Sequence, residues 1–315
     1  MIAANVVLWI SLITSGPDDV PKARALAYLA AEVPRWSGEH HCYSCHNNGD
    51  AARALYAAAR LGRKFPASVT LDTDRWLARP EGWDKNGGDG PFSDKGLARL
   101  QFASALAAAV DSGRGLDRAP LLRAAARLAD DQGPDGSWPI EGPDQVGSPT
   151  TYGRNLATWS ARETLRAADP TTYRPRIERA DAWLRLRPIE SVMDASTALL
   201  GRAFDDSPQG LARRDAAFDL IRRGQTKSGG WGPYVNSSGE AFDTALALLA
   251  LDRYRDRPGV SAMIAAGLSF LVAAQQEDGS WIETTRPAGA ESYAQRLSTT
   301  GWATLALLNV ARPGP

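Results

Sequence analysis

The sequence has no net charge and no run of basic residues. Its 36 Lys and Arg are balanced by 36 Asp and Glu, and the cations are scattered along the chain rather than clustered. Nucleic acids and anionic membrane surfaces are bound by basic patches or tails. Both are therefore excluded as partners, and we interpret most of the charges as solvated helix faces.

Long apolar runs are also missing. The most apolar stretch, from Met1 to Ile13, is too short for a transmembrane helix, which needs about twenty residues. We expect residues 1–16 to be an export signal, although no cation precedes Lys22; the alternative is an apolar arm packed on the domain. Export predicts a periplasmic or otherwise extracytoplasmic protein without a transmembrane span, with one domain at residues 17–315.

Cysteine and histidine are scarce and occur together. The two cysteines and three histidines all lie in the segment His40-His41-Cys42-Tyr43-Ser44-Cys45-His46. A Cys-x-x-Cys-His arrangement is typical of covalent haem c attachment. Two thiols at this spacing can add to the two vinyl groups, and the imidazole of the next residue can ligate the iron. The segment resembles the attachment site of c-type cytochromes, which implies haem binding by Cys42, Cys45 and His46.

Two alternatives to haem remain open for this segment. Cys42 and Cys45 can form a structural disulfide, or they can bind zinc together with one or two of the three histidines. For a haem, the second axial ligand decides between electron transfer and binding of a small ligand. Met193 is a candidate for that ligand, although a buried core methionine is the alternative interpretation.

The chain also contains an internal repeat. In three segments a Gln precedes a Trp by six residues, with Gly in the loop between them. The interval from Trp138 to Trp231 is nearly twice that from Trp231 to Trp281, so a degenerate copy without its Trp is expected at residues 177–204. Two earlier copies, at Trp36 and Trp83, bring the count to six. The three clear pairs are Gln132 and Trp138, Gln225 and Trp231, and Gln275 and Trp281.

Each copy has the pattern of a helical hairpin. An amphipathic segment such as residues 262–276 ends in the Trp loop, and a more apolar, Ala-rich segment such as residues 299–310 follows. Ser, Thr or Asp precede the apolar segments as expected helix N-caps, as at Ser93-Asp94, Thr150-Thr151 and Thr299-Thr300. No stretch alternates with period two. The sequence therefore predicts an all-α protein of about six hairpins closed into an α/α toroid, with the apolar helices inside.

The Gln-Trp repeats resemble the QW repeats of the squalene-hopene cyclase and protein prenyltransferase superfamily. The copy at residues 266–281 and the apolar helix starts at residues 242–249 and 300–305 carry the likeness. The resemblance implies a single terpenoid cyclase-like toroid with an apolar or isoprenoid ligand. The acidic cluster of the cyclases is reduced here to Asp243, and the prenyltransferase zinc ligands have no counterpart in this sequence.

Three functions follow as expectations. The first is an exported toroid with one covalent haem c that takes part in electron transfer with a redox partner protein, or in haem chemistry on an apolar ligand. The second is an isoprenoid-processing enzyme that uses Asp243 or Asp194 as its acid. The third is a binding or scaffold toroid with a disulfide or zinc at Cys42 and Cys45. The sequence leaves open whether the protein is an enzyme.

Overall fold

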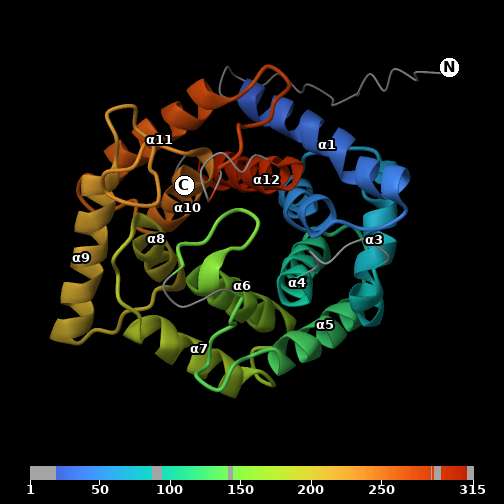
Figure 1. The fold of residues 1–315 in the computed structure, drawn as a ribbon, viewed down its shortest axis with the longest axis horizontal. Coiled ribbons are helices and arrows are strands. Elements are labelled where there is room, and N and C mark those ends of the chain that lie inside the picture. The colour runs from blue at the N-terminus through green and yellow to red at the C-terminus, as the bar shows by residue number, and fades with distance from the viewer. Residues whose placement is uncertain (1–18, 87–93, 141–144, 285, 287–291, 311–315) are drawn as a thin grey trace.

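The structure is a computed structural model that describes residues 19–86, 94–140, 145–284, 286 and 292–310. The expected export signal at residues 1–16 lies outside this range. Within the described residues, twelve α-helices form six consecutive hairpins arranged in a closed ring (Figure 1). The α/α toroid predicted from the sequence is confirmed, and the same residues contain two isolated bridges but no strand.

The second helix of each hairpin belongs to the inner layer and the first to the outer layer. The inner layer contains α2 (Ala52–Arg60), α4 (Lys95–Asp111), α6 (Gly153–Ala168), α8 (Val192–Gly201), α10 (Ala241–Asp252) and α12 (Tyr293–Val310). The outer layer contains α1 (Val20–His40), α3 (Leu71–Leu77), α5 (Arg118–Asp130), α7 (Arg174–Leu186), α9 (Pro208–Gly224) and α11 (Val260–Ala274). Short helical turns are η2 (Cys45–Ala51), η3 (Ala67–Val69) and η4 (Pro80–Lys85).

Burial explains the division into layers. In α10, ten of twelve residues are buried, because an inner helix packs on its two inner neighbours and on the outer ring. Outer helices such as α9 bury one face and expose the other, as their charged residues require. Since every inner helix is joined to the next by an outer helix running back, the inner helices all begin at the same end of the barrel.

The tryptophans hold the two helices of a hairpin together. The indole Nε1 of Trp231 donates to the carbonyl of Ile221 at 2.7 Å, and its backbone N–H donates to Thr244 Oγ1 at 2.8 Å. The hairpins of Trp138 and Trp281 repeat both bonds. All three side chains are almost completely buried. A structural role for these tryptophans, expected from the sequence, accounts for their contacts.

The glutamines join each hairpin to the next. Gln225 Nε2 donates to the Gly229 carbonyl at 2.8 Å and to the Met263 carbonyl of the following outer helix at 2.9 Å. Gln275 makes the same pair of bonds to Gly279 and Pro21, which joins the last hairpin to the first. The repeat pattern predicts that the glutamines satisfy backbone groups; the structure shows that these bonds also close the ring.

Several predicted N-caps are wrong. Asp94 does cap α4 by accepting from Leu97 N at 3.0 Å. By contrast, Thr150 and Thr151 lie in a turn before α6, whose N-cap residue is Tyr152. Thr299 and Thr300 lie inside α12, which begins at Tyr293, and Thr300 bonds the Trp281 loop instead. A threonine near a helix start can cap its own helix or hydrogen-bond the preceding Trp loop, and the tertiary contact with that loop decides which of the two occurs.

Candidate functional site

The Cys-x-x-Cys-His segment crosses from the first hairpin's loop into its inner helix. His40 ends α1, and exposed His41 caps it with a left-handed backbone (φ 53°). Cys42 is buried, whereas Cys45 and His46 form the first turn of η2, a π-helical segment that continues into α2. The predicted loop position is correct for Cys42, while Cys45 and His46 are already helical.

Side-chain amides fix this segment on its neighbours. Asn47 Nδ2 donates to the Glu32 carbonyl of α1 at 2.9 Å, and Asn48 Nδ2 donates to Thr73 Oγ1 of α3 at 2.8 Å. Asn48 Oδ1 accepts from Ser44 N at 3.0 Å. Asn47 and Asn48 are fully buried. The two asparagines therefore anchor η2 to α1 and α3.

Burial controls the protonation of Cys45 and His46. It lowers the pKa of His46 to about 4, so the imidazole is neutral at physiological pH. Its Nδ1 atom lies 2.9 Å from Ser298 Oγ of α12. Burial also raises the pKa of the Cys45 thiol to about 12, and Asp50 adds to the effect. Cys45 is thus a half-buried thiol that packs against the hydrophobic core and favours its protonated form.

Asp50 lies where helices from opposite sides of the ring meet. Its Oδ2 accepts from Gln101 Nε2 of α4 at 2.9 Å, and its Oδ1 accepts from the Tyr152 hydroxyl at the start of α6. Ser298 of α12 also hydrogen-bonds this carboxyl. Burial raises the pKa of Asp50, although the nearby Arg53 and these hydrogen-bond donors act to lower it. We name this group the central polar cluster; its members are His46, Asp50, Arg53, Gln101, Tyr152 and Ser298.

Backbone features support the cluster. Gly49 lies against Gln101 and Gly301 lies against the Asp50 carbonyl, where an added Cβ would come within 3.1 and 2.8 Å. These glycines let η2 approach α4 and α12 closely. Tyr152 has φ 65° and ψ −32°, a rare conformation for a residue with a Cβ. Such strained residues concentrate at functional sites, which points to the cluster as more than a packing device.

Aromatic side chains from α6, α10 and α12 meet beside the central polar cluster. Trp302 of α12 meets Tyr152, Trp159 and Phe242 at ring-centroid distances of 5.7, 6.4 and 5.9 Å. The Arg53 guanidinium lies over the Trp302 ring, 4.1 Å from its centroid. The π face of Trp302 is therefore already in contact with a cation, the kind of group that indole faces attract.

Asp243 occupies the first turn of α10, at the same barrel end as His46. Burial raises its pKa to about 7, an effect opposed by Arg286 and reinforced by Glu240. Arg286 donates to Asp243 Oδ2 and also lies 3.4 Å from Glu240 Oε2. Asp243 Oδ1 is buried without a hydrogen-bond partner among the described residues. A carboxyl of this pKa holds its proton on a substantial fraction of molecules near neutral pH.

The other two predicted site residues, Asp194 and Met193, make contacts typical of a helix cap and of core packing. Asp194 forms a capping box with Ser191 at the start of α8 and accepts from Asn155 Nδ2 at 2.5 Å. Met193 is buried in the core. Its helix α8 packs on α6, α7, α9 and α10, whereas η2 packs on α1, α2, α4 and α12. Iron ligation by Met193 and acid catalysis by Asp194 stay predictions, and their contacts favour capping and packing.

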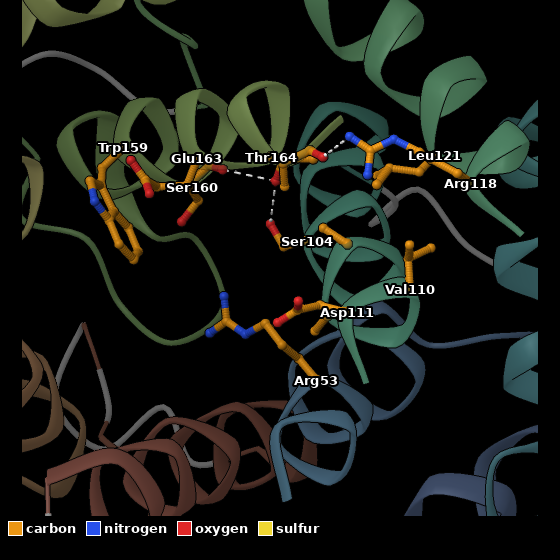
Figure 2. A pocket seen from close by; sticks show the side chains of 13 residues that line it. Arg53, Ser104, Val110, Asp111, Arg118, Leu121, Trp159, Ser160, Glu163 and Thr164 are labelled. Carbon is orange, nitrogen blue, oxygen red and sulfur yellow. Dashed lines mark hydrogen bonds between the residues drawn. The ribbon is translucent and has the colours of Figure 1, made fainter. Parts of the chain in front are cut away.

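A cavity lies toward the opposite end of the inner helices. It has a volume of about 540 Å³ and opens between the C-terminal halves of α4 and α6, beside the start of α5. Figure 2 shows the Arg53 guanidinium and the Ser160 hydroxyl facing each other across it. Arg53 thus belongs both to the central polar cluster and to the wall of this cavity.

No cluster of three His, Cys, Asp or Glu side chains suited to a metal ion is found in the described ranges. Zinc binding by Cys42, Cys45 and their neighbouring histidines stays a prediction. In the same ranges, no helix is both long and apolar enough to cross a membrane.

Solved structures share the fold of this chain. A single-residue variant of the type II terpene cyclase MstE from Scytonema, with bound geranylgeranyl dihydroxybenzoate as substrate, is 16% identical, with a TM-score of 0.54 over 94% of this chain and 98% of that one. Another variant of the same cyclase, bound to the product merosterolic acid A, is 17% identical, with a TM-score of 0.53 over 93% and 98%.

A possible member of the GH105 family from Salmonella enterica serovar Paratyphi A is 12% identical, with a TM-score of 0.53 over 95% of this chain and 96% of that one. No family model matches the sequence, and no curated protein matches it. At these identities the likeness defines the fold class, a terpenoid cyclase-like helical toroid, and not the reaction.

The sequence alone predicted site roles for Cys42, Cys45, His46 and Asp243, which stay predictions, and gave no role to Asp50 or Tyr152. One signal was present, because Asp50 follows His46 by four residues and one helical turn places both on the same face. Nothing in the sequence paired Asp50 with Tyr152, which is 102 residues away, or Asp243 with Arg286.

Proposed function

We propose that the protein is an acid catalyst for an apolar, isoprenoid-type substrate, with Asp243 as the proton donor. The observation that carries the proposal is the raised pKa of Asp243, about 7, at the first turn of an inner helix. A general acid works best when its pKa lies near the working pH. The terpene cyclase neighbours, one of which binds a geranylgeranyl substrate, support the choice of substrate class.

The chemistry requires the protonated carboxyl to reach a carbon–carbon double bond. The Asp243 O–H bond breaks, the proton forms a C–H bond with one alkene carbon, and the other carbon becomes a cation. A second double bond of the substrate attacks this cation and closes a ring, and loss of a proton from a carbon beside the final cation gives a neutral isomer. The carboxylate that remains pairs with Arg286, which already contacts Oδ2. Phe242, which precedes Asp243 in α10, presents a ring whose centroid lies 6.0 Å from the Arg286 guanidinium, and aromatic faces stabilise cations.

Access is the condition that this mechanism places on the structure. The Asp243 side chain is fully buried, and Arg286 covers it while also donating to the Gly147 carbonyl of the α5–α6 loop. We expect substrate to reach the carboxyl when Arg286 moves away from Asp243 and Gly147. The reaction is therefore expected to depend on displacement of this arginine.

The test is incubation of the purified full-length chain with squalene and, separately, with geranylgeraniol. The expected result is a cyclised isomer of unchanged mass, identified by gas chromatography and mass spectrometry. Asp243→Asn should abolish the product, whereas Asp219→Asn, on the exposed face of α9, should not. Absence of any cyclised product from folded protein, or an unchanged yield from Asp243→Asn, would overturn the proposal.

We also propose covalent haem c attachment at Cys42 and Cys45 as a second function. The favouring observation is His46: its imidazole is neutral and its Nδ1 contacts Ser298, which leaves Nε2 as the ligating nitrogen. A haem there would supply redox or ligand-binding chemistry. The donor set fits, but the packing does not, because Cys42 is buried and Cys45 packs against the core.

Attachment would therefore have to precede the closure of the first hairpin. Expression in the presence of a haem-attachment system, followed by intact mass and a visible spectrum, tests the proposal. The expected result is one added haem and a Soret band, both lost in Cys45→Ala. A colourless protein of unmodified mass would refute it.

A further inference from the structure

The α4–α6 cavity contains a guanidinium group with unmatched hydrogen-bond donors. Arg53 is 11% exposed, and its Nε and Nη2 atoms are buried with no acceptor among the described residues. The nearest carboxylate oxygen, Asp50 Oδ1, is 3.9 Å away, beyond hydrogen-bonding distance. Asp50 instead accepts from Tyr152 and Gln101. Arg53 therefore carries a charge that its surroundings satisfy only in part.

The other charges that line the cavity already have partners. Asp111 lies 3.5 Å from Arg60, and Glu163 lies 2.8 Å from Arg162. Arg118 donates to the last carbonyls of α6, those of Ala167 and Ala168, at 2.8 and 2.6 Å. Leaving a buried charged donor without an acceptor costs free energy. Among the charges of this cavity, Arg53 is the one that a ligand can complement.

A second unpartnered donor lies opposite Arg53. The Ser160 side chain of α6 is buried, with an exposed fraction of 3%, and its hydroxyl has no partner among the described residues. In Figure 2 this hydroxyl points across the cavity toward the guanidinium. The lining is mixed: it includes the polar Ser104 and Thr164 as well as apolar side chains, Ala107 and Ala108 on α4 and Leu121 on α5. One ligand can therefore place a polar group between the two donors and an apolar part along the walls.

We propose that this cavity binds a small amphipathic anion whose carboxylate or phosphate group lies between Arg53 and Ser160. Arginine recognises both oxyanions through its planar set of N–H donors. The ring of a small aromatic acid fits within about 540 Å³. This site is separate from Asp243, so it stands whether or not the protein cyclises isoprenoids.

Calorimetric titration of the full-length protein tests the site with three matched probes. Benzoate carries a carboxylate, phenyl phosphate carries a phosphate, and benzamide has the shape of benzoate without its charge. Benzoate or phenyl phosphate should bind at least about tenfold more tightly than benzamide. Tighter binding of benzoate identifies a carboxylate site, and tighter binding of phenyl phosphate identifies a phosphate site. Equal binding of benzamide, or no binding of either anion, overturns the proposal.

Variants locate the bound probe. Arg53→Met should weaken binding of the preferred anion at least about tenfold, and Ser160→Ala about threefold, because the latter removes one neutral hydrogen bond. Arg123→Met, an exposed arginine of α5, is the control and should change nothing. If Arg53→Met folds, an unchanged affinity in both variants overturns the assignment. If Arg53→Met does not fold, an unchanged affinity in Ser160→Ala alone overturns it.

Discussion

Arg286, in the loop before α12, donates a hydrogen bond to Oδ2 of Asp243 in the first turn of α10, while the other oxygen of that carboxyl has no partner among the described residues. The carboxyl is thus satisfied on one side only. Burial, reinforced by the neighbouring Glu240, outweighs the contact with the Arg286 guanidinium and raises the pKa of Asp243 to about 7.

The first prediction concerns pH and Asp243. Because its pKa is higher in the folded protein than in the unfolded chain, where it is near 3.8, the folded state binds a proton more strongly. Its contribution to the free energy of unfolding is fully present below about pH 4, falls as pH rises, and is lost above about pH 7. Urea titrations from pH 4 to 8 should show wild type losing stability relative to Asp243→Asn.

The loss should be on the order of a few kcal/mol across this interval. A stability difference between wild type and Asp243→Asn that does not change with pH would contradict the raised pKa. Asp219→Asn serves as the control, since both Asp219 and its arginine partners are exposed.

The second prediction concerns the hydroxyl of Tyr152. Tyr152→Phe keeps the ring but removes one donor from the buried carboxyl of Asp50, so it should lower the free energy of unfolding by about 1–3 kcal/mol. Tyr173→Phe is the matched control, because its hydroxyl makes an exposed bond of 3.4 Å to the Leu122 carbonyl. Equal effects of both substitutions in urea unfolding would show that the central polar cluster has no special energetic weight.

The third prediction concerns ring closure by Gln275. Gln275→Ala removes the bonds to the Pro21 and Gly279 carbonyls and should destabilise the protein by about 1–3 kcal/mol. Amide hydrogen exchange should also increase at the start of α1, which this bond joins to the last hairpin. Gln209→Ala, at an exposed position in α9, should have almost no effect. Unchanged exchange in α1 would argue against the closing role.

The fourth prediction compares two glycine-to-alanine substitutions, one expected to lower and one to raise the free energy of unfolding. Gly301→Ala places a methyl group 2.8 Å from the Asp50 carbonyl oxygen and should destabilise by about 1–3 kcal/mol through overpacking. Gly38→Ala in α1 meets no atom within 4 Å and should stabilise by about 0.5–1 kcal/mol, because alanine favours helix. Thermal unfolding of the two variants measures both effects, and a neutral Gly301→Ala would mean that η2 can move away from α12.

The repeats could be predicted from the sequence because the residues that define each copy lie close together in the chain. The Gln and Trp of one copy stand six residues apart, and helical periodicity within each segment separated inner from outer helices. The predicted inner segment at residues 299–310 lies within α12 (Tyr293–Val310), and the outer segment at residues 262–276 matches α11 (Val260–Ala274) within two residues at each end. Errors arose at helix starts, where a threonine can either cap its own helix or bond the preceding Trp loop.

By itself, the sequence determined the α/α toroid, the division of its helices and the place of Cys42, Cys45 and His46 in the first hairpin. Only the tertiary structure decided which charges meet, such as Asp243 with Arg286 and Asp50 with Tyr152. The reason is physical: helices and turns follow from neighbours a few residues apart, whereas burial and pairing of a carboxyl depend on groups brought together by closing the ring.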